Sequence, residues 1–237
     1  NYHLLYNIFN FFKFWLVLQN KHITPARRTS LELLNKILVS NEPFEKIIFS
    51  SKKFLSLEDK DKRFTRLIIT TVLRKFGQID FIMNQFIKKG SIKKNNLKNI
   101  IRIGIAELIF IKSARYAAIN EAVETTKINY SNRLSKFTNA VLRNIDRDKE
   151  KLSSMIIDEM NYPSWLIENW KKTWGTKQTK EIINYFQKEP YLDISVAGDP
   201  QEMEKVFKGK IIYNKTLRID EIINPSKLPF YQTENNN

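Results

Sequence analysis

The chain has 237 residues, 42% of them hydrophobic, so it can bury one large or two small cores and is globular rather than disordered. It contains no cysteine, which excludes disulfides, thiolate metal sites and cysteine nucleophiles, and its only histidines are His3 and His22. The formal net charge of +15 is uneven: residues 24–150 hold 26 Lys and Arg against 13 Asp and Glu, whereas residues 151–237 hold 12 against 12.

A cationic surplus confined to one part of the chain indicates a polyanionic partner, most often nucleic acid, because each neutralised phosphate releases counterions. The alternative is a proteome-wide bias toward lysine. The neutral second part of the chain disfavours that alternative, since the same bias would act on both parts.

Residues 1–22 are apolar and aromatic, but Asn7 and Lys13 interrupt them. Only about fifteen residues separate Leu4 from Leu18, fewer than the roughly 20 that span a bilayer, and no small-residue cleavage site follows. We therefore favour a fragment end or an upstream extension over a membrane anchor, and expect no membrane partner. A membrane-tethered protein is the alternative.

Thr24 and Pro25 predict the N-cap and first residue of a helix whose buried side carries leucines and isoleucines up to residue 38. Arg27 and Arg28 occupy its first turn, where the helix dipole disfavours cations. An external anion would explain this position, which makes both arginines candidate RNA contacts. Two solvated arginines are the alternative.

Apolar spacing predicts a helix that begins at Ser56 and ends at Gly77, and another that carries Ile79 to Ile87. The lysine-rich segment 88–98 is typical of a solvated turn that can also touch phosphates. Residues 97–111 are apolar on most sides and predict the central buried helix of the domain.

Two amphipathic helices follow, one around residues 118–126 and one around residues 134–145. At about 100° per residue, four cations of the second helix fall within a quarter turn, opposite its apolar stripe. These residues, here called the basic ridge, are Arg133, Lys136, Arg143 and Arg147.

The character of the chain changes after Lys151. A short helix with Trp165 and Trp170 and a second one with Ile182, Ile183 and Phe186 are predicted first. Alternating strand patterns follow in YLDISVA, KIIY and TLRI, and Asp199-Pro200 opens a short helix. The sequence thus predicts a mainly α chain, with a helical domain at residues 23–150 and linker helices with a small α+β subdomain at residues 151–237.

Nothing in the sequence supports catalysis or metal binding by this chain. It has no glycine-rich phosphate loop or dinucleotide fingerprint, and the histidines lie in the leader. The carboxylate pair Glu121/Glu124 is typical of a solvated helix face. Trp165, Trp170 and Trp174 could stack on bases, but at helical spacing we expect them in a core.

Five segments together carry a family resemblance: PARRTSLELLNKIL (25–38), DKDKRFTRLIITTVLRKFGQID (59–80), IIRIGIAELIFI (100–111), AAINEAVETTK (117–127) and FTNAVLRNI (137–145). They cover about half of the chain and resemble the NusB-type RNA-binding domain. That domain occurs in the antitermination factor NusB and at the start of bacterial 16S rRNA cytosine-5 methyltransferases of the Sun/Fmu family. The resemblance implies an all-helical NusB-like bundle.

A stand-alone antitermination factor would end soon after the NAVLR helix, whereas this chain continues with YPSWLIENWKKTWG (162–175), which resembles the linker of the methyltransferases. The resemblance implies a cytoplasmic enzyme that methylates small-subunit rRNA with S-adenosylmethionine. The cofactor and two cysteines would belong to a catalytic domain that is missing here. The chain alone would therefore bind no cofactor and would not methylate.

The resemblance also assigns RNA contacts to the matching positions Arg27, Arg28, Arg74 and Arg143. The remaining ridge residues, Arg133, Lys136 and Arg147, rest on helical geometry alone. Arg74 and Arg143 could instead be bonded to Glu121 or Glu124 inside the bundle. As a function, the alternative is a stand-alone NusB-type antitermination factor acting with a protein partner.

Overall fold

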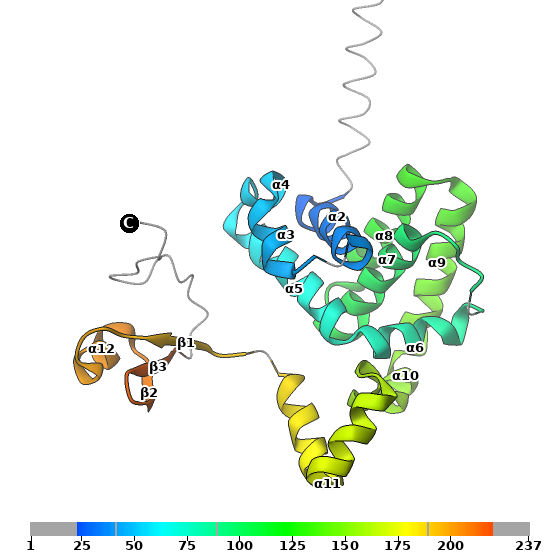
Figure 1. The fold of residues 1–237 in the computed structure, drawn as a ribbon. Helices are drawn as coiled ribbons and strands as arrows, with labels where there is room; N and C mark the ends of the chain where they lie inside the picture. Colours follow the sequence, from blue (N-terminus) through cyan, green and yellow to red (C-terminus); the bar gives the residue numbers. More distant parts are fainter. Residues whose placement is uncertain (1–22, 41, 89, 189, 220–237) are drawn as a thin grey trace, which may run out of the picture. The chain divides into compact units, whose positions relative to one another are not determined.

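The computed structural model describes residues 23–40, 42–88, 90–188 and 190–219 (Figure 1). Residues up to Lys180 belong to one compact unit and those from Glu181 onward to a second. The predicted leader at residues 1–22 and the tail from residue 220 lie outside the described residues. The predicted domain boundary at residue 150 stays a prediction.

The first unit is helical. In chain order it contains α2 (Pro25–Ser40), α3 (Phe44–Ser50), α4 (Lys52–Leu55), α5 (Asp59–Arg74), α6 (Phe76–Phe86), α7 (Asn95–Ile105), the π-helix η2 (Ala106–Ile111), α8 (Arg115–Asn129), α9 (Asn132–Arg147), α10 (Lys149–Met155), the 3-10 helix η3 (Asp158–Asn161) and the first part of α11 (Ser164–Phe186).

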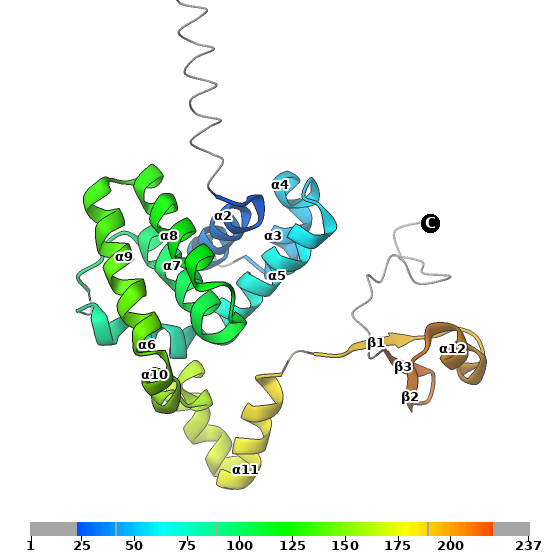
Figure 2. The same ribbon diagram turned by 180° about the vertical axis from the view of Figure 1, so that it is seen from behind.

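The centre of this unit is α7, as the apolar run at residues 97–111 predicts. Eight of its eleven residues are buried, and it packs against α2, α5, α6, α8 and α9 (Figures 1 and 2). Its last turn continues as η2, and Lys112, directly after η2, adopts the left-handed conformation with φ 56°. The sequence predicts the buried helix but gives no sign of the π turn.

Two predicted boundaries are wrong in detail. The helix expected to run from Ser56 to Gly77 is α5, which begins at Asp59 and ends at Arg74, and Gly77 lies in the first turn of α6. Glycine is needed there for another reason: a Cβ on Gly77 would overlap the backbone carbonyl of Met160 in η3. The backbone N–H of Gln78 also donates to Asn161 Oδ1 at 3.0 Å.

The tryptophans are also placed differently from the expectation. Trp165 and Trp174 are exposed and Trp170 is half-buried. Trp170 lies 5.6 Å from Tyr162 and 6.1 Å from Trp174 between ring centroids, so the rings form a partly solvated cluster rather than a core. Gly175, with φ 77° and ψ 165°, kinks α11 where the sequence predicts a break between two helices.

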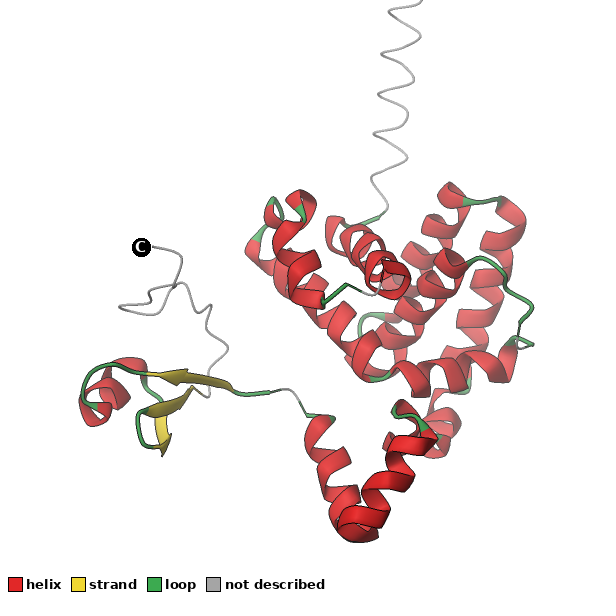
Figure 3. Ribbon diagram, viewed as in Figure 1, coloured by secondary structure: helices red, strands yellow, loops and turns green. Residues whose placement is uncertain are grey.

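The second unit is the predicted small α+β subdomain (Figure 3). After the end of α11 it holds β1 (Leu192–Ser195), α12 (Pro200–Phe207), β2 (Lys210–Tyr213) and β3 (Thr216–Ile219). The strands form an antiparallel sheet in the order β1-β3-β2, with Leu192 opposite Ile219. Its small core consists of Val196, Phe207, Leu217 and Ile219.

Candidate nucleic-acid interface

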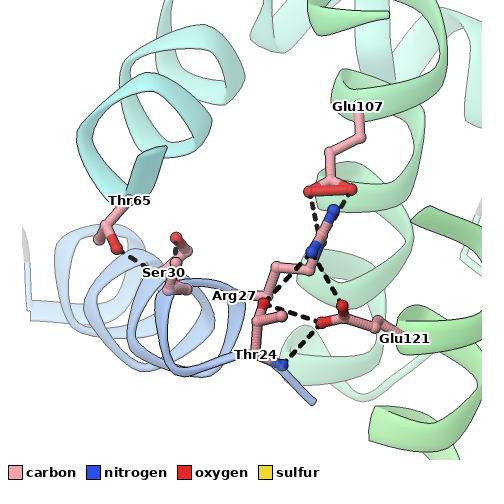
Figure 4. A network of polar contacts seen from close by, with 7 residues as sticks. Thr24, Arg27, Ser30, Thr65, Glu107 and Glu121 are labelled. Carbon is pink, nitrogen blue, oxygen red and sulfur yellow. Dashed lines mark hydrogen bonds and ion pairs between the residues drawn. The ribbon is translucent and has the colours of Figure 1, made fainter. Parts of the chain in front are cut away.

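Arg27 lies inside the first unit and joins three elements (Figure 4). From the first turn of α2, its Nε donates to both carboxylate oxygens of Glu107 in η2, at 2.8 and 3.0 Å, and its Nη1 donates to Glu121 Oε1 in α8, at 2.9 Å. Its side chain is 13% exposed, and the guanidinium carbon lies 5.0 Å from the centroid of the Phe64 ring. We call Arg27, Glu107 and Glu121 the buried clasp.

Thr24, directly before α2, also bonds to residues of the buried clasp. Its backbone N–H and its hydroxyl both donate to Glu121 Oε2, at 2.8 and 3.0 Å, and its hydroxyl oxygen accepts from Arg27 Nη1 at 3.2 Å. Glu121 is therefore buried and bonded, so the expectation that it belongs to a solvated helix face is wrong. The buried clasp fixes the start of α2 against η2 and α8.

Burial raises the pKa of Glu107 above its ordinary value of 4.5, although the hydrogen bond and charge of Arg27 act in the opposite direction. The Glu107 side chain is only 1% exposed, and the nearby Glu121 carboxylate adds repulsion. Burial disfavours the charged forms of both Glu107 and Arg27, and the ion pair between them offsets part of that cost.

Two of the other arginines assigned by resemblance, Arg28 in α2 and Arg74, are half-buried like Arg27. Arg74, the last residue of α5, is half-buried and has no polar partner among the residues that the structure describes, so a bond to Glu121 or Glu124 is not seen. As RNA contacts, Arg27, Arg28 and Arg74 stay predictions.

The basic ridge faces solvent along α9. All four of its side chains are exposed, while Thr138, Val141, Leu142 and Ile145 on the other side of the helix are buried.

Only two ridge residues have a polar side-chain partner among the described residues. Arg147 Nε bonds Asp148 Oδ1 at 3.2 Å, and Arg143 Nε donates to Asn139 Oδ1 at 3.0 Å, rather than to Glu121 or Glu124. The ridge thus presents four cations that are little neutralised by the protein. Their contact with RNA stays a prediction.

Sequence reasoning missed the residues that hold Arg27. A signal for them exists: Glu107 is the single acidic residue in the apolar run IIRIGIAELIFI, and a carboxylate in a buried helix requires a cation or hydrogen-bond donors nearby. The sequence could not tell which cation supplies them, because Arg27 is 80 residues away in the chain.

The described residues contain no group of three or more His, Cys, Asp or Glu side chains that could hold a metal ion. None of the helices in the described ranges combines the length and apolarity that a membrane crossing requires.

The described residues up to α9 therefore define an all-helical domain, built around one buried helix, closed by an internal ion-pair network and carrying a cationic outer helix. The model of the NusB family matches residues 24–147, more than half of the chain. The chain belongs to the NusB family, as the five sequence segments predict.

Curated relatives bear the name of the predicted enzyme. The chain is 28% identical, over 59% of its length, to a probable ribosomal RNA small subunit methyltransferase B of Synechocystis, and covers 33% of that protein. It is 28% identical, over 67% of its length, to the protein of the same name in Bacillus subtilis, and covers 37% of it. The chain thus spans little more than a third of the length of these relatives.

Among solved structures, the crystal structure of PH0851 is similar over 86% of this chain and 50% of that chain, with a TM-score of 0.59 and 17% identity. This likeness concerns the fold alone. It extends beyond the 124 residues that the NusB family model matches.

Proposed function

We propose that this chain is the RNA-binding part of an S-adenosylmethionine-dependent 16S rRNA cytosine-5 methyltransferase, in which it positions small-subunit rRNA for methylation. The observation that carries the proposal is the basic ridge on α9: four exposed cations on the solvent side of a NusB-family bundle. The names of the curated relatives support the choice of ribosomal RNA as the substrate.

The chemistry of the ridge suits a nucleic-acid backbone. Lys and Arg near the surface displace condensed counterions from phosphates, and the gain is largest where the protein does not already neutralise the cations. Within the described residues, Arg133 and Lys136 have no acidic partner, and Arg147 has only the adjacent Asp148. These side chains are therefore available to phosphates without breaking internal bonds of the bundle.

In this proposal the methyl group comes from S-adenosylmethionine, and the described residues do not contact the cofactor. Two hollows in the bundle are lined by helical residues of α2, α7, η2, α8 and α9. Neither hollow has the glycine turn between a strand and a helix that nucleotide cofactors use. The chain's own contribution is binding and orientation of RNA in the cytoplasm.

The alternative, a stand-alone antitermination-type factor with a protein partner, has less support. Residues after α9 fold into α10, η3, α11 and a three-stranded sheet with its own core, so the chain continues as ordered structure beyond the NusB-family match. The curated relatives named above are called methyltransferases rather than antitermination factors.

The proposal is tested by measuring, at one fixed salt concentration, the affinity of the 237-residue chain for labelled fragments of small-subunit and large-subunit rRNA of equal length. We expect at least about tenfold tighter binding to one small-subunit fragment, since a specific site adds base or shape contacts to the phosphate term. Equal affinity for all fragments, or no binding, would contradict a positioning role.

A further inference from the structure

A groove of about 390 Å³ runs between α8 and α9, two helices that lie side by side (Figure 2). Its floor is formed by Ile119 and Val123, both half-buried. Its polar lining comes from both helices: Arg115, Tyr116, Asn120, Asn139, Arg143 and Asp146. We call this site the α8–α9 groove.

Several polar groups of the groove have unused hydrogen-bonding capacity among the described residues. Within the described residues the Asn120 carboxamide has no partner. The Asn139 carboxamide uses its oxygen alone there, which accepts from Arg143 Nε at 3.0 Å. The two terminal amines of Arg143 have no acceptor within the described ranges, since its one hydrogen bond there uses Nε. A groove with this many free donors and acceptors has the means to read a polar ligand.

Asp146 adds a buried acceptor. Its side chain is 14% exposed, and its Oδ1 is buried and has no hydrogen-bond partner among the described residues. In the part of the chain that the structure describes, Arg115 Nη1 is the one partner of its Oδ2, at the long distance of 3.5 Å. Because the Arg115 side chain is 70% exposed, it can turn toward an anion and release Asp146 Oδ2 from this long contact.

An aromatic ring stands at the start of α8 beside these groups. Tyr116 lines the groove and is 80% exposed, so its ring is open to a stacking partner. The groove also shares Arg143 with the basic ridge, so a strand whose phosphates follow the ridge would pass its opening.

We propose that the α8–α9 groove receives one unpaired base of a bound RNA strand, with Tyr116 stacking on the base, Arg115 and Arg143 holding the flanking phosphates, and Asp146 accepting from an exocyclic amine. This inference rests on the proposed RNA-binding function and adds the place and the class of nucleotide. Stacking on an aromatic ring and hydrogen bonding to a base edge are the means by which proteins read single-stranded RNA.

The carboxylate predicts a preference among bases. Cytosine offers an N4 amine next to an acceptor nitrogen, which suits a carboxylate beside an asparagine amide. Uracil instead carries carbonyl oxygens on both sides of its ring N–H, and these oxygens would be repelled by the Asp146 carboxylate. Since the two bases have the same size, their comparison isolates the amine.

The test measures binding of the 237-residue chain to labelled ten-nucleotide oligo(C) and oligo(U) RNA by fluorescence anisotropy. We expect oligo(C) to bind about tenfold more tightly than oligo(U), and Tyr116→Ala and Arg143→Ala each to weaken oligo(C) binding by roughly tenfold. Arg63→Ala is the control: it removes the same charge as Arg143→Ala from an exposed position on α5, and should change affinity less than about threefold.

Asp146→Asn keeps the shape of the side chain and should bring the affinities for oligo(C) and oligo(U) within about twofold of each other. If the chain binds RNA but the groove variants lose no more affinity than Arg63→Ala does, the groove is not a nucleotide site. A groove that binds a peptide instead would give this same result. If the unchanged chain binds neither RNA, the proposed function fails together with the inference.

Discussion

Arg27 shows how a residue that resembles an RNA contact can serve the fold instead. Its guanidinium is the cation that satisfies two buried carboxylates from two other elements, and it links the start of α2 to the centre of the bundle. Removing one partner of such a group leaves uncompensated charge in a region of low dielectric constant, which costs more than the pair contributes when intact.

Arg27→Ala should therefore lower the free energy of unfolding by about 3–5 kcal/mol, as measured by urea denaturation followed by circular dichroism. Arg63→Ala, an exposed arginine on α5, should change it by less than about 0.5 kcal/mol. Equal effects of the two substitutions would show that the buried clasp contributes nothing to stability.

Glu107 makes the stability of the first unit depend on pH. The pKa of Glu107 is raised in the folded state. Between the ordinary value of 4.5 and this raised pKa, Glu107 therefore keeps its proton in the folded chain and loses it in the unfolded chain. The stabilisation linked to this proton is fully present below that value and is lost as the pH rises through the raised pKa.

Glu107→Gln removes this titration while keeping the side chain's size. We expect the stability of the unchanged chain to fall, relative to that of the variant, as the pH is raised from about 4 toward neutrality. Urea denaturation of both proteins across this range checks the trend, since the other carboxyl groups titrate in both. A difference that does not vary with pH would contradict the raised pKa.

Among the elements, α6 packs so closely against the backbone of η3 that the position facing η3 has no room for a side chain. Gly77 lies against the carbonyl of Met160 in η3, and Lys75 Nζ bonds Asp158 Oδ1 of the same element at 3.2 Å. The contact fixes the segment after α10 on the bundle. From the sequence pattern, Gly77 is predicted only to end a helix, because the pattern does not show which distant backbone segment lies against this glycine.

Gly77→Ala should consequently lower stability by about 1–3 kcal/mol, since the added methyl group forces α6 and η3 apart. Thermal unfolding followed by circular dichroism measures the effect. Gly198→Ala is the matched control, because its Cβ would meet Met203 only at ordinary contact distances of 3.7 and 3.9 Å. An unchanged melting temperature for Gly77→Ala would mean that η3 does not need this contact.

For the whole molecule, the apolar periodicity of the sequence predicts much of the architecture. The buried run at residues 97–111, the amphipathic α9 and the strand patterns of KIIY and TLRI correspond to observed elements, because burial on one face dictates their spacing. The solvent-facing basic ridge follows from the same periodicity.

What could not be predicted from the sequence depends on contacts between distant residues. Three features can be known only from the tertiary structure. They are the partners of Arg27, the exposure of Trp165 and Trp174, and the contact of Arg115 with Asp146 across the α8–α9 groove. Resemblance assigns both Arg27 and Arg143 to RNA by position, but the structure buries most of the Arg27 side chain and leaves Arg143 exposed.

The claim that the basic ridge binds RNA phosphates is tested most directly by the salt dependence of binding. For the 237-residue chain and a small-subunit rRNA fragment, the logarithm of the affinity should fall linearly with the logarithm of salt concentration, with a slope of about −0.7 per neutralised phosphate on single strands. The double variant Lys136→Ala/Arg147→Ala removes two ridge cations and should flatten this slope by about 1.4.

The charge-matched control is Lys60→Ala/Arg63→Ala on the exposed side of α5, which should leave the slope unchanged. A flattened slope for the ridge variant alone is the result that the account predicts. If both double variants keep the slope of the unchanged chain, or both flatten it equally, the ridge is not the surface that meets RNA.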